Sequence, residues 1–166
     1  DKVYYIVLNI KEKYMETAYL AGGCFWCVEA IFQRVNGVIE LKSGYCNGST
    51  QNPSYESICT GQTGHAEVVR IDFDESVVSF EELLDVFNAT HDPTSLNQQG
   101  ADKGTQYRSA IFYVNDSQKE IATSVIGNIK GAVTEITELD VFYPAEGYHQ
   151  NYFNDNSNQP YCQMVI

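Results

Sequence analysis

Strand-like stretches alternate with helical stretches along this chain of 166 residues, and this alternation is what most constrains its fold. The strand-like stretches are rich in β-branched and aromatic residues. They are Thr17–Leu20, Val38–Tyr45, Ala66–Phe73, Ser109–Val114 and Glu135–Val141. Helical stretches interleaved with strands in one compact chain favour an α/β or α+β fold, in which helices pack against a β-sheet.

Start and stop signals predict three helices between these strands. Two capping boxes, Ser79–Glu82 and Ser117–Glu120, begin two of them, and the second helix is expected to end near Gly131. The third is expected to follow Gly23 and to stop at Gly37. Two polar segments, 91–107 and the long C-terminal coil from 143 onward, do not fit regular structure.

Composition excludes several classes of partner. The 22 acidic and 10 basic side chains give a net charge of −12, whereas binding to nucleic acid or to an anionic membrane needs clustered Lys and Arg. No apolar run approaches the roughly 18–20 residues of a membrane span. The apolar piece Val3–Leu8 is too short for a signal peptide and is followed by Lys11 and Lys13. We therefore expect a cytoplasmic protein without nucleic-acid or membrane partners.

The five cysteines are odd in number and too few for a disulfide scaffold, so at least one thiol is free, metal-bound or reactive. Cys24 follows two glycines at the start of a predicted helix, where unpaired N–H groups and the helix dipole lower a thiol's pKa. The alternative is that Cys24 is only a small residue of the hydrophobic core. Cys27 lies three residues on, at the spacing of thioredoxin-like sites, but Val28 rather than proline follows it.

The cysteines and histidines match no common zinc-binding pattern. Only one Cys-x-x-Cys pair is present, and no second pair follows it. We therefore expect no bound metal.

Glu67 is a candidate general acid. Strand alternation places it on the same face as Val69 and Ile71, and desolvation on an apolar face raises a carboxyl pKa. An acid that is still protonated near neutral pH can donate its proton. The alternative is that Glu67 turns to solvent or pairs with an arginine.

Two tyrosines and a tail cysteine complete the candidates. Tyr55 lies in a turn that leads into a short helical piece, and Tyr107 precedes a predicted strand. Their phenols can donate hydrogen bonds to an oxygen that gains charge during reaction. Cys162 follows an Asn-rich stretch near the C-terminus, where a thiol can reach another thiol.

Together these segments resemble the type A peptide methionine sulfoxide reductase family. The resemblance runs from about residue 18 to the C-terminus. Its motifs are Gly23–Trp26, Ser43–Tyr45, Asn52–Glu56, Thr63–Glu67, His91–Thr94, Gln99–Asp102, Gly104–Ser109, Phe142–Glu146 and Tyr148–Gln150.

The resemblance implies a two-layer α/β sandwich around a mixed sheet. It implies a catalytic domain over 18–166, which leaves 1–17 as an N-terminal extension of unassigned role. The expected activity is reduction of the S epimer of methionine sulfoxide, free or in proteins. The resemblance implies no bound cofactor and an external dithiol, such as thioredoxin, as reductant. We also expect a monomer.

By the same resemblance, Cys24 corresponds to the nucleophile that attacks the sulfoxide sulfur. Glu67 corresponds to the acid that protonates the sulfoxide oxygen. Tyr55 and Tyr107 correspond to the phenols that hydrogen-bond this oxygen.

Other positions correspond to substrate-binding residues. Phe25 and Trp26 match the apolar pocket for the substrate methyl group. Asp102 and His149 match positions that hold the substrate backbone or order the site.

The resolving cysteine is expected to be Cys162, because many family members carry this thiol in a C-terminal segment. Cys27 is the alternative, and Cys46 and Cys59 have no implied role. A different function, a general thiol–disulfide oxidoreductase that uses Cys24 and Cys27, stays open on the residues alone.

Overall fold

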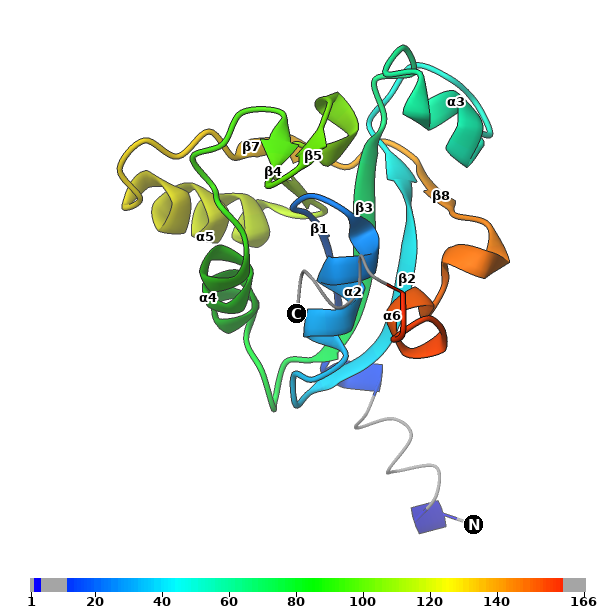
Figure 1. Cartoon of the computed structure of the whole chain (residues 1–166). Helices are drawn as coiled ribbons and strands as arrows, with labels where there is room; N and C mark the ends of the chain where they lie inside the picture. The colour runs from blue at the N-terminus through cyan, green and yellow to red at the C-terminus, as the bar shows by residue number, and fades with distance from the viewer. Residues whose placement is uncertain (1, 4–11, 160–166) are drawn as a thin grey trace.

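The computed structural model of the chain describes residues 2–3 and 12–159. Within them, one sheet has the strand order β7-β6-β1-β3-β2-β8, and a separate two-stranded ladder pairs β4 with β5 (Figure 1). The strands are β1 (Met15–Ala21), β2 (Val38–Cys46), β3 (Ala66–Asp74), β4 (Gln98–Gln99), β5 (Asp102–Lys103), β6 (Ala110–Tyr113), β7 (Glu135–Glu138) and β8 (Phe142–Pro144). The sheet is mixed, because β6 and β7 are parallel and the other neighbours are antiparallel.

Helices cover one face of this sheet. The described helices are α2 (Phe25–Phe32), α3 (Tyr55–Cys59), α4 (Phe80–Thr90), α5 (Asp116–Gly127) and α6 (Tyr152–Asp155), with 3-10 turns η1 (Thr105–Tyr107) and η2 (Gly147–His149). Apolar residues of α2, α4 and α5 share one buried cluster with alternate residues of the central strands. A smaller cluster lies on the opposite face. The predicted α/β fold, with helices packed against a mixed sheet, is confirmed.

The helix bounds differ from the sequence prediction in three places, one of which is that α5 ends at Gly127 rather than near Gly131. The capping box at Ser79 forms as predicted, but α5 begins before Ser117, because the Asn115 side chain accepts the Gln118 N–H as N-cap. The predicted box at Ser117 is therefore wrong. The helix after Gly23 ends at Phe32 rather than at Gly37.

Both segments expected to be irregular contain short elements that bring residues toward α2. Segment 91–107 forms the β4–β5 hairpin and η1, and the C-terminal segment forms β8, η2 and α6. Gln150 then bonds both backbone groups of Ser43: its Oε1 accepts the N–H and its Nε2 donates to the carbonyl, each at 2.9 Å. The Gln150 side-chain amide thus continues the hydrogen bonding to β2 beyond the point where β8 ends.

The N-terminal part of the sheet begins earlier than the expected catalytic domain. β1 includes Met15 to Thr17, which belong to the segment set apart above as an extension. In the part of the chain that the structure describes, no helix has both the length and the apolar character needed to cross a bilayer.

The β2–β8 contact gives a stability prediction. A Cβ on Gly44 would lie 2.5 Å from the carbonyl oxygen of Tyr143 and would also overlap the Phe142 ring. We expect Gly44→Ala to lower the free energy of unfolding by about 1–3 kcal/mol, because β8 must move away. Urea unfolding measures this change.

Gly127→Ala in α5 is the matched control, because nothing lies within 4 Å of its added Cβ. It should instead stabilise the protein by about 0.5–1 kcal/mol, the usual gain for alanine over glycine in a helix. Equal effects of the two substitutions would contradict the close approach at Gly44.

Candidate active site

Cys24 is the N-cap residue of α2, so the helix begins just after the thiol as predicted. The preceding turn requires Gly23, whose φ of +93° lies in the left-handed region. Cys24 is 8% exposed, and its carbonyl accepts the N–H groups of Cys27 and Val28 at 3.1 and 3.4 Å. The thiol therefore lies at the positive end of the helix dipole.

Glu67 lies beside this helix start. It is 2% exposed on β3, directly opposite Tyr45 of β2. Its Oε1 accepts the backbone N–H of Phe25 at 3.2 Å, and its Oε2 accepts Nε2 of Gln106 at 3.5 Å. The carboxyl is bonded to the residue that follows Cys24, so acid and thiol are held close together.

Burial raises the pKa of Glu67 to about 8. The hydrogen bonds from Phe25 and Gln106 lower this pKa, and the charges of Asp102 and Cys27 raise it further. The direction matches the sequence expectation. At neutral pH most of the Glu67 carboxyl is protonated and can donate its proton.

The structure brings both predicted tyrosines to this carboxyl. Tyr55 is the first residue of α3 and Tyr107 the last of η1, and both are half-buried. Burial raises the pKa of each phenol, and the charge of Glu67 raises both further. Cys24 also raises the pKa of Tyr107. Both hydroxyls therefore keep their protons at neutral pH and can act as donors.

An aromatic wall stands next to the thiol. The Trp26 ring stacks on Tyr152, with centroids 3.7 Å apart and an interplanar angle of 10°. Trp26 Nε1 donates to Nδ1 of His149 at 3.0 Å. Phe25 is buried, with its ring 5.1 Å from the His149 ring. These contacts hold the indole in one orientation.

His149 is fully buried and orients its neighbours as a neutral ring. Burial lowers its pKa, and the nearby Glu146 carboxylate only partly offsets this effect. The neutral ring can accept the Trp26 indole N–H at Nδ1, and its Nε2 lies 3.7 Å from Glu146 Oε2.

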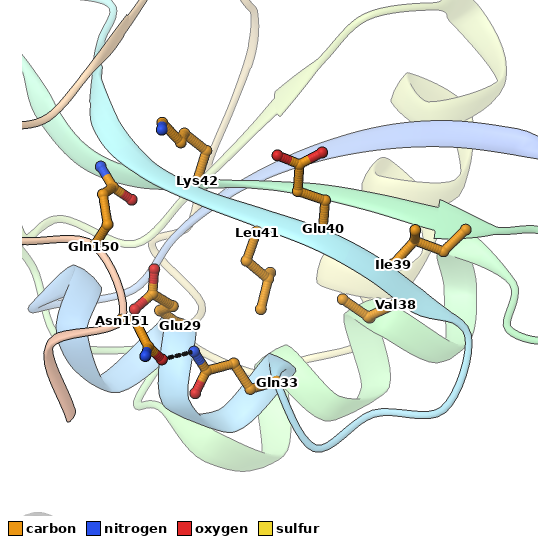
Figure 2. Close-up of a pocket in the computed structure, with 9 residues that line it drawn as sticks. All are labelled: Glu29, Gln33, Val38, Ile39, Glu40, Leu41, Lys42, Gln150 and Asn151. Carbon is orange, nitrogen blue, oxygen red and sulfur yellow. Dashed lines mark hydrogen bonds between the residues drawn. The ribbon is translucent and has the colours of Figure 1, made fainter. Parts of the chain in front are cut away.

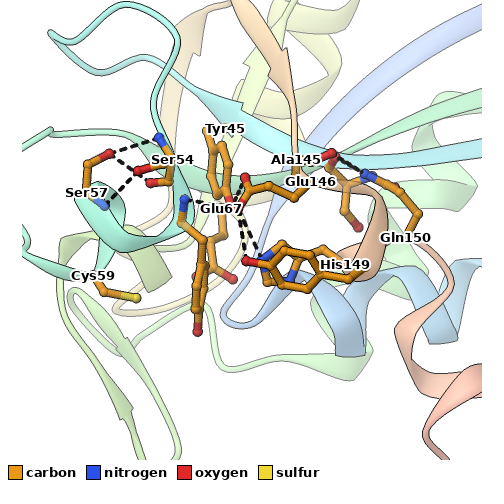
Figure 3. A network of polar contacts seen from close by, with 12 residues as sticks. Tyr45, Ser54, Ser57, Cys59, Glu67, Ala145, Glu146, His149 and Gln150 are labelled. Atoms are coloured by element: carbon orange, nitrogen blue, oxygen red, sulfur yellow. Dashed lines mark hydrogen bonds and ion pairs between the residues drawn. The ribbon is translucent and has the colours of Figure 1, made fainter.

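Glu146 joins several parts of the site through its carboxylate (Figure 3). Its Oε1 accepts the Tyr45 hydroxyl at 3.3 Å. Its Oε2 accepts the Tyr55 backbone N–H at 3.2 Å and the Tyr148 hydroxyl at 3.1 Å. Burial acts to raise the pKa of Glu146, but the effects led by hydrogen bonds from its own backbone N–H, the Tyr55 N–H and the Tyr148 hydroxyl outweigh it, so the pKa is lowered. One carboxylate thus fixes β2, α3 and η2 relative to one another.

Two further predicted residues, Asp102 and Cys27, lie near this centre. Asp102, on β5, is close enough for its charge to raise the pKa of both Glu67 and Tyr107. Cys27 is half-buried, one helical turn from Cys24.

The other cysteines differ in their surroundings. Cys46 is buried, and burial raises its thiol pKa. Cys59 is exposed, it raises the pKa of the Tyr55 phenol, and its Sγ lies 3.9 Å from Gln106 Nε2. Cys162 lies outside the described residues, so the structure does not place it.

A separate cavity of about 370 Å³ lies between α2 and the first half of β2 (Figure 2). It is lined by Glu29, Gln33, Val38, Ile39, Glu40, Leu41, Lys42, Gln150 and Asn151. None of these residues was predicted as part of the site. Within residues 2–3 and 12–159, no three or more His, Cys, Asp and Glu side chains gather in a way that could hold a metal ion.

Sequence reasoning missed three residues that the structure places in the site: Gln106, Glu146 and Tyr152. The first two lie inside motifs that carry the family resemblance, but nothing in a single sequence shows that they are buried or what they bond. Tyr152 is one of 12 tyrosines and lies in a segment expected to be coil. Its stacking on Trp26 has no sequence signal.

This arrangement suits one kind of chemistry. A thiol at a helix N-terminus can attack an electrophile, while a neutral carboxylic acid and two phenols stabilise and protonate an oxygen on it. The aromatic wall can receive an apolar group of the same molecule.

Comparison with known proteins identifies the family. The family model described as "Peptide methionine sulfoxide reductase" matches residues 16–166. The "Peptide methionine sulfoxide reductase MsrA" of Vesicomyosocius okutanii is 63% identical over 153 residues, which cover 92% of this chain and 94% of the relative.

Solved structures agree with this match. Mxr1 from Saccharomyces cerevisiae in its reduced form superimposes with a TM-score of 0.82 at 35% identity, covering 93% of this chain and 92% of that one. Mxr1 in complex with Trx2 superimposes with a TM-score of 0.56 at 25% identity, covering 84% and 86%.

The buried acid predicts a pH-dependent stability. The folded-state pKa of Glu67, about 8, lies above the ordinary glutamate value of 4.5, so the unfolded chain loses this proton first as pH rises. Relative to Glu67→Gln, the wild-type protein should therefore lose stability between about pH 5 and pH 8, by roughly 1 kcal/mol per pH unit.

Urea unfolding of both proteins across this range measures the difference in unfolding free energy. Below about pH 4 the difference should be constant, because the carboxyl is then protonated in both states. A difference that stays flat through pH 8 would show that Glu67 ionises as it does in the unfolded chain.

Proposed function

Since the chain belongs to the peptide methionine sulfoxide reductase family, we propose that it reduces the S epimer of methionine sulfoxide, free or in proteins, with Cys24 as nucleophile. The observation that carries this proposal is the bond from the Phe25 N–H to Glu67. It holds a carboxyl that is protonated at neutral pH next to a thiol at a helix N-terminus.

In the first step, the Cys24 thiolate attacks the sulfoxide sulfur. Glu67 gives its proton to the sulfoxide oxygen, because this oxygen leaves sulfur readily only when protonated. Tyr55 and Tyr107 donate hydrogen bonds to the same oxygen. The oxygen is transferred to the sulfur of Cys24, which becomes a sulfenic acid, and two electrons pass from this sulfur to the substrate sulfur. Methionine is then released.

Phe25, Trp26, Asp102 and His149 bind the substrate in this proposal. The Trp26 indole and the Phe25 ring receive the methyl group beside the sulfoxide. His149 holds the indole in place through the bond at Nδ1. Asp102, at the edge of the site, holds the substrate backbone.

In the second step, a further thiol condenses with the sulfenic acid, forming a disulfide and releasing water. We assign this role to Cys162, and Cys27 is the alternative. An external dithiol then reduces the disulfide by thiol–disulfide exchange. The solved complex of Mxr1 with Trx2 supports thioredoxin as this reductant.

The epimer preference can be tested by NADPH-coupled thioredoxin recycling with each epimer of methionine sulfoxide. We expect turnover with the S epimer alone, because only one configuration at sulfur places the oxygen at Glu67 while the methyl group meets Trp26. Cys24→Ser is the control and should abolish turnover. Comparable rates with both epimers would refute the proposed geometry.

The resolving cysteine can be tested with matched variants. Cys162→Ser should release about one methionine per enzyme and then stop, because the sulfenic acid has no second thiol to form a disulfide. Cys27→Ser should still recycle with thioredoxin. Peptide mapping after one turnover without reductant identifies the bridge, and a Cys24–Cys27 bridge would reverse the assignment.

A further inference from the structure

Gln106 is a buried glutamine between the acid and an exposed thiol. It lies in η1, next to Tyr107, and is 5% exposed. Its Nε2 donates to Glu67 Oε2 at 3.5 Å and lies 3.9 Å from the Sγ of Cys59. With both contacts made by the amide nitrogen, the N–H side of the amide faces the carboxyl.

The two oxygens of Glu67 receive donors of different kinds. Oε1 accepts a backbone N–H, from Phe25, and the start of α2 fixes its position. Oε2 accepts a side-chain N–H, from Gln106. Among the described residues these are the hydrogen bonds that Glu67 receives. When the acid gives up its proton, the carboxylate that remains is 2% exposed and depends on these two donors in place of water.

We propose that Gln106 is a positioning residue that sets the acid strength of Glu67, because its amide stabilises the carboxylate left after proton donation and orients Oε2. This inference rests on the proposed function, in which Glu67 is the proton donor. The bond from Gln106 acts against burial, since it lowers the pKa of Glu67 while desolvation raises it.

Other groups also act on Glu67 and must stay unchanged in a test. The titratable groups coupled to it electrostatically come from α2, β2, α3, β5 and η1. They are Cys27, Tyr45, Tyr55, Asp102 and Tyr107. Cys24 also belongs with these groups, because its charge raises the pKa of Tyr107. Cys59 belongs with them because it raises the pKa of Tyr55 and lies close to Gln106. Substitution of Gln106 leaves all of these residues in place and removes one donor.

The test uses Gln106→Met, which keeps the volume and the unbranched chain but has no N–H donor. The pH at which kcat/KM falls on the alkaline side should rise by about one unit, because Glu67 holds its proton more tightly. The plateau should fall by about three- to tenfold, because a weaker acid donates less readily. A role in packing alone would lower the plateau without moving the alkaline limb.

A direct titration of Glu67 makes the test independent of turnover. The carboxyl carbons of ¹³C-labelled glutamate are followed by NMR, and the Glu67 signal is the one absent in Glu67→Gln. We expect a titration near pH 8 in the wild-type protein and about one unit higher in Gln106→Met. Gln106→Glu should raise it further, because two carboxyls then face each other.

Gln118→Met is the matched control. Gln118 is also buried, at 4% exposure, and its amide bonds Thr17 and Val114 far from the site. Its substitution should cost stability without moving the Glu67 titration.

The outcomes separate this inference from the proposed function. An unchanged or lowered Glu67 titration in folded Gln106→Met would overturn the role of Gln106. If that variant does not fold, Gln106→Glu decides, and the absence of an upward shift has the same meaning. If the titration moves as expected but wild-type enzyme reduces no methionine sulfoxide, the proposed function fails and the control of Glu67 by Gln106 stands.

Discussion

The hydrogen bond from the Phe25 N–H to Glu67 is the contact on which the rest of the site depends. The first N–H groups of a helix have no partner within the helix, and a buried carboxyl needs donors. One bond meets part of both needs. It also joins the start of α2 to β3, so the helix that carries Cys24 cannot shift along the sheet without leaving Glu67 with one donor fewer. The bond that satisfies the start of the helix therefore also sets the relative position of the thiol and the acid.

The C-terminal segment is held to this centre by polar contacts and by stacked aromatic rings rather than by a buried apolar core. Glu146 bonds three donors from different elements, and Gln150 pairs with the backbone of Ser43. Few buried apolar residues support α6, in contrast to the large cluster under α2, α4 and α5. A segment held in this way can open at lower cost than the core. Such freedom suits a chain segment that leads toward Cys162.

Periodicity and capping chemistry predicted five strands of the sheet, the three main helices and the position of Cys24, because these depend on neighbours within a few residues. Glu67 was predicted because strand alternation carries information about burial. Ser117 misled the prediction because Asn115 offered a competing N-cap two residues earlier. Gln106, Glu146 and Tyr152 were missed because their partners are distant in sequence. Glu146, for example, bonds the backbone of Tyr55 across 91 positions. Only the assembled sheet brings such pairs together.

The pairing of Tyr45 with Glu67 across β2 and β3 has a consequence for folding. Side chains alternate between the two faces of a strand, so a slip of β3 by one residue would move Glu67 away from α2 and replace it with a neighbour such as Val68. A chain trapped in that register could be compact and rich in β-structure, yet it would have no proton donor at the thiol. The activity recovered after refolding therefore counts the molecules whose strands are correctly aligned, which secondary-structure spectra alone do not distinguish.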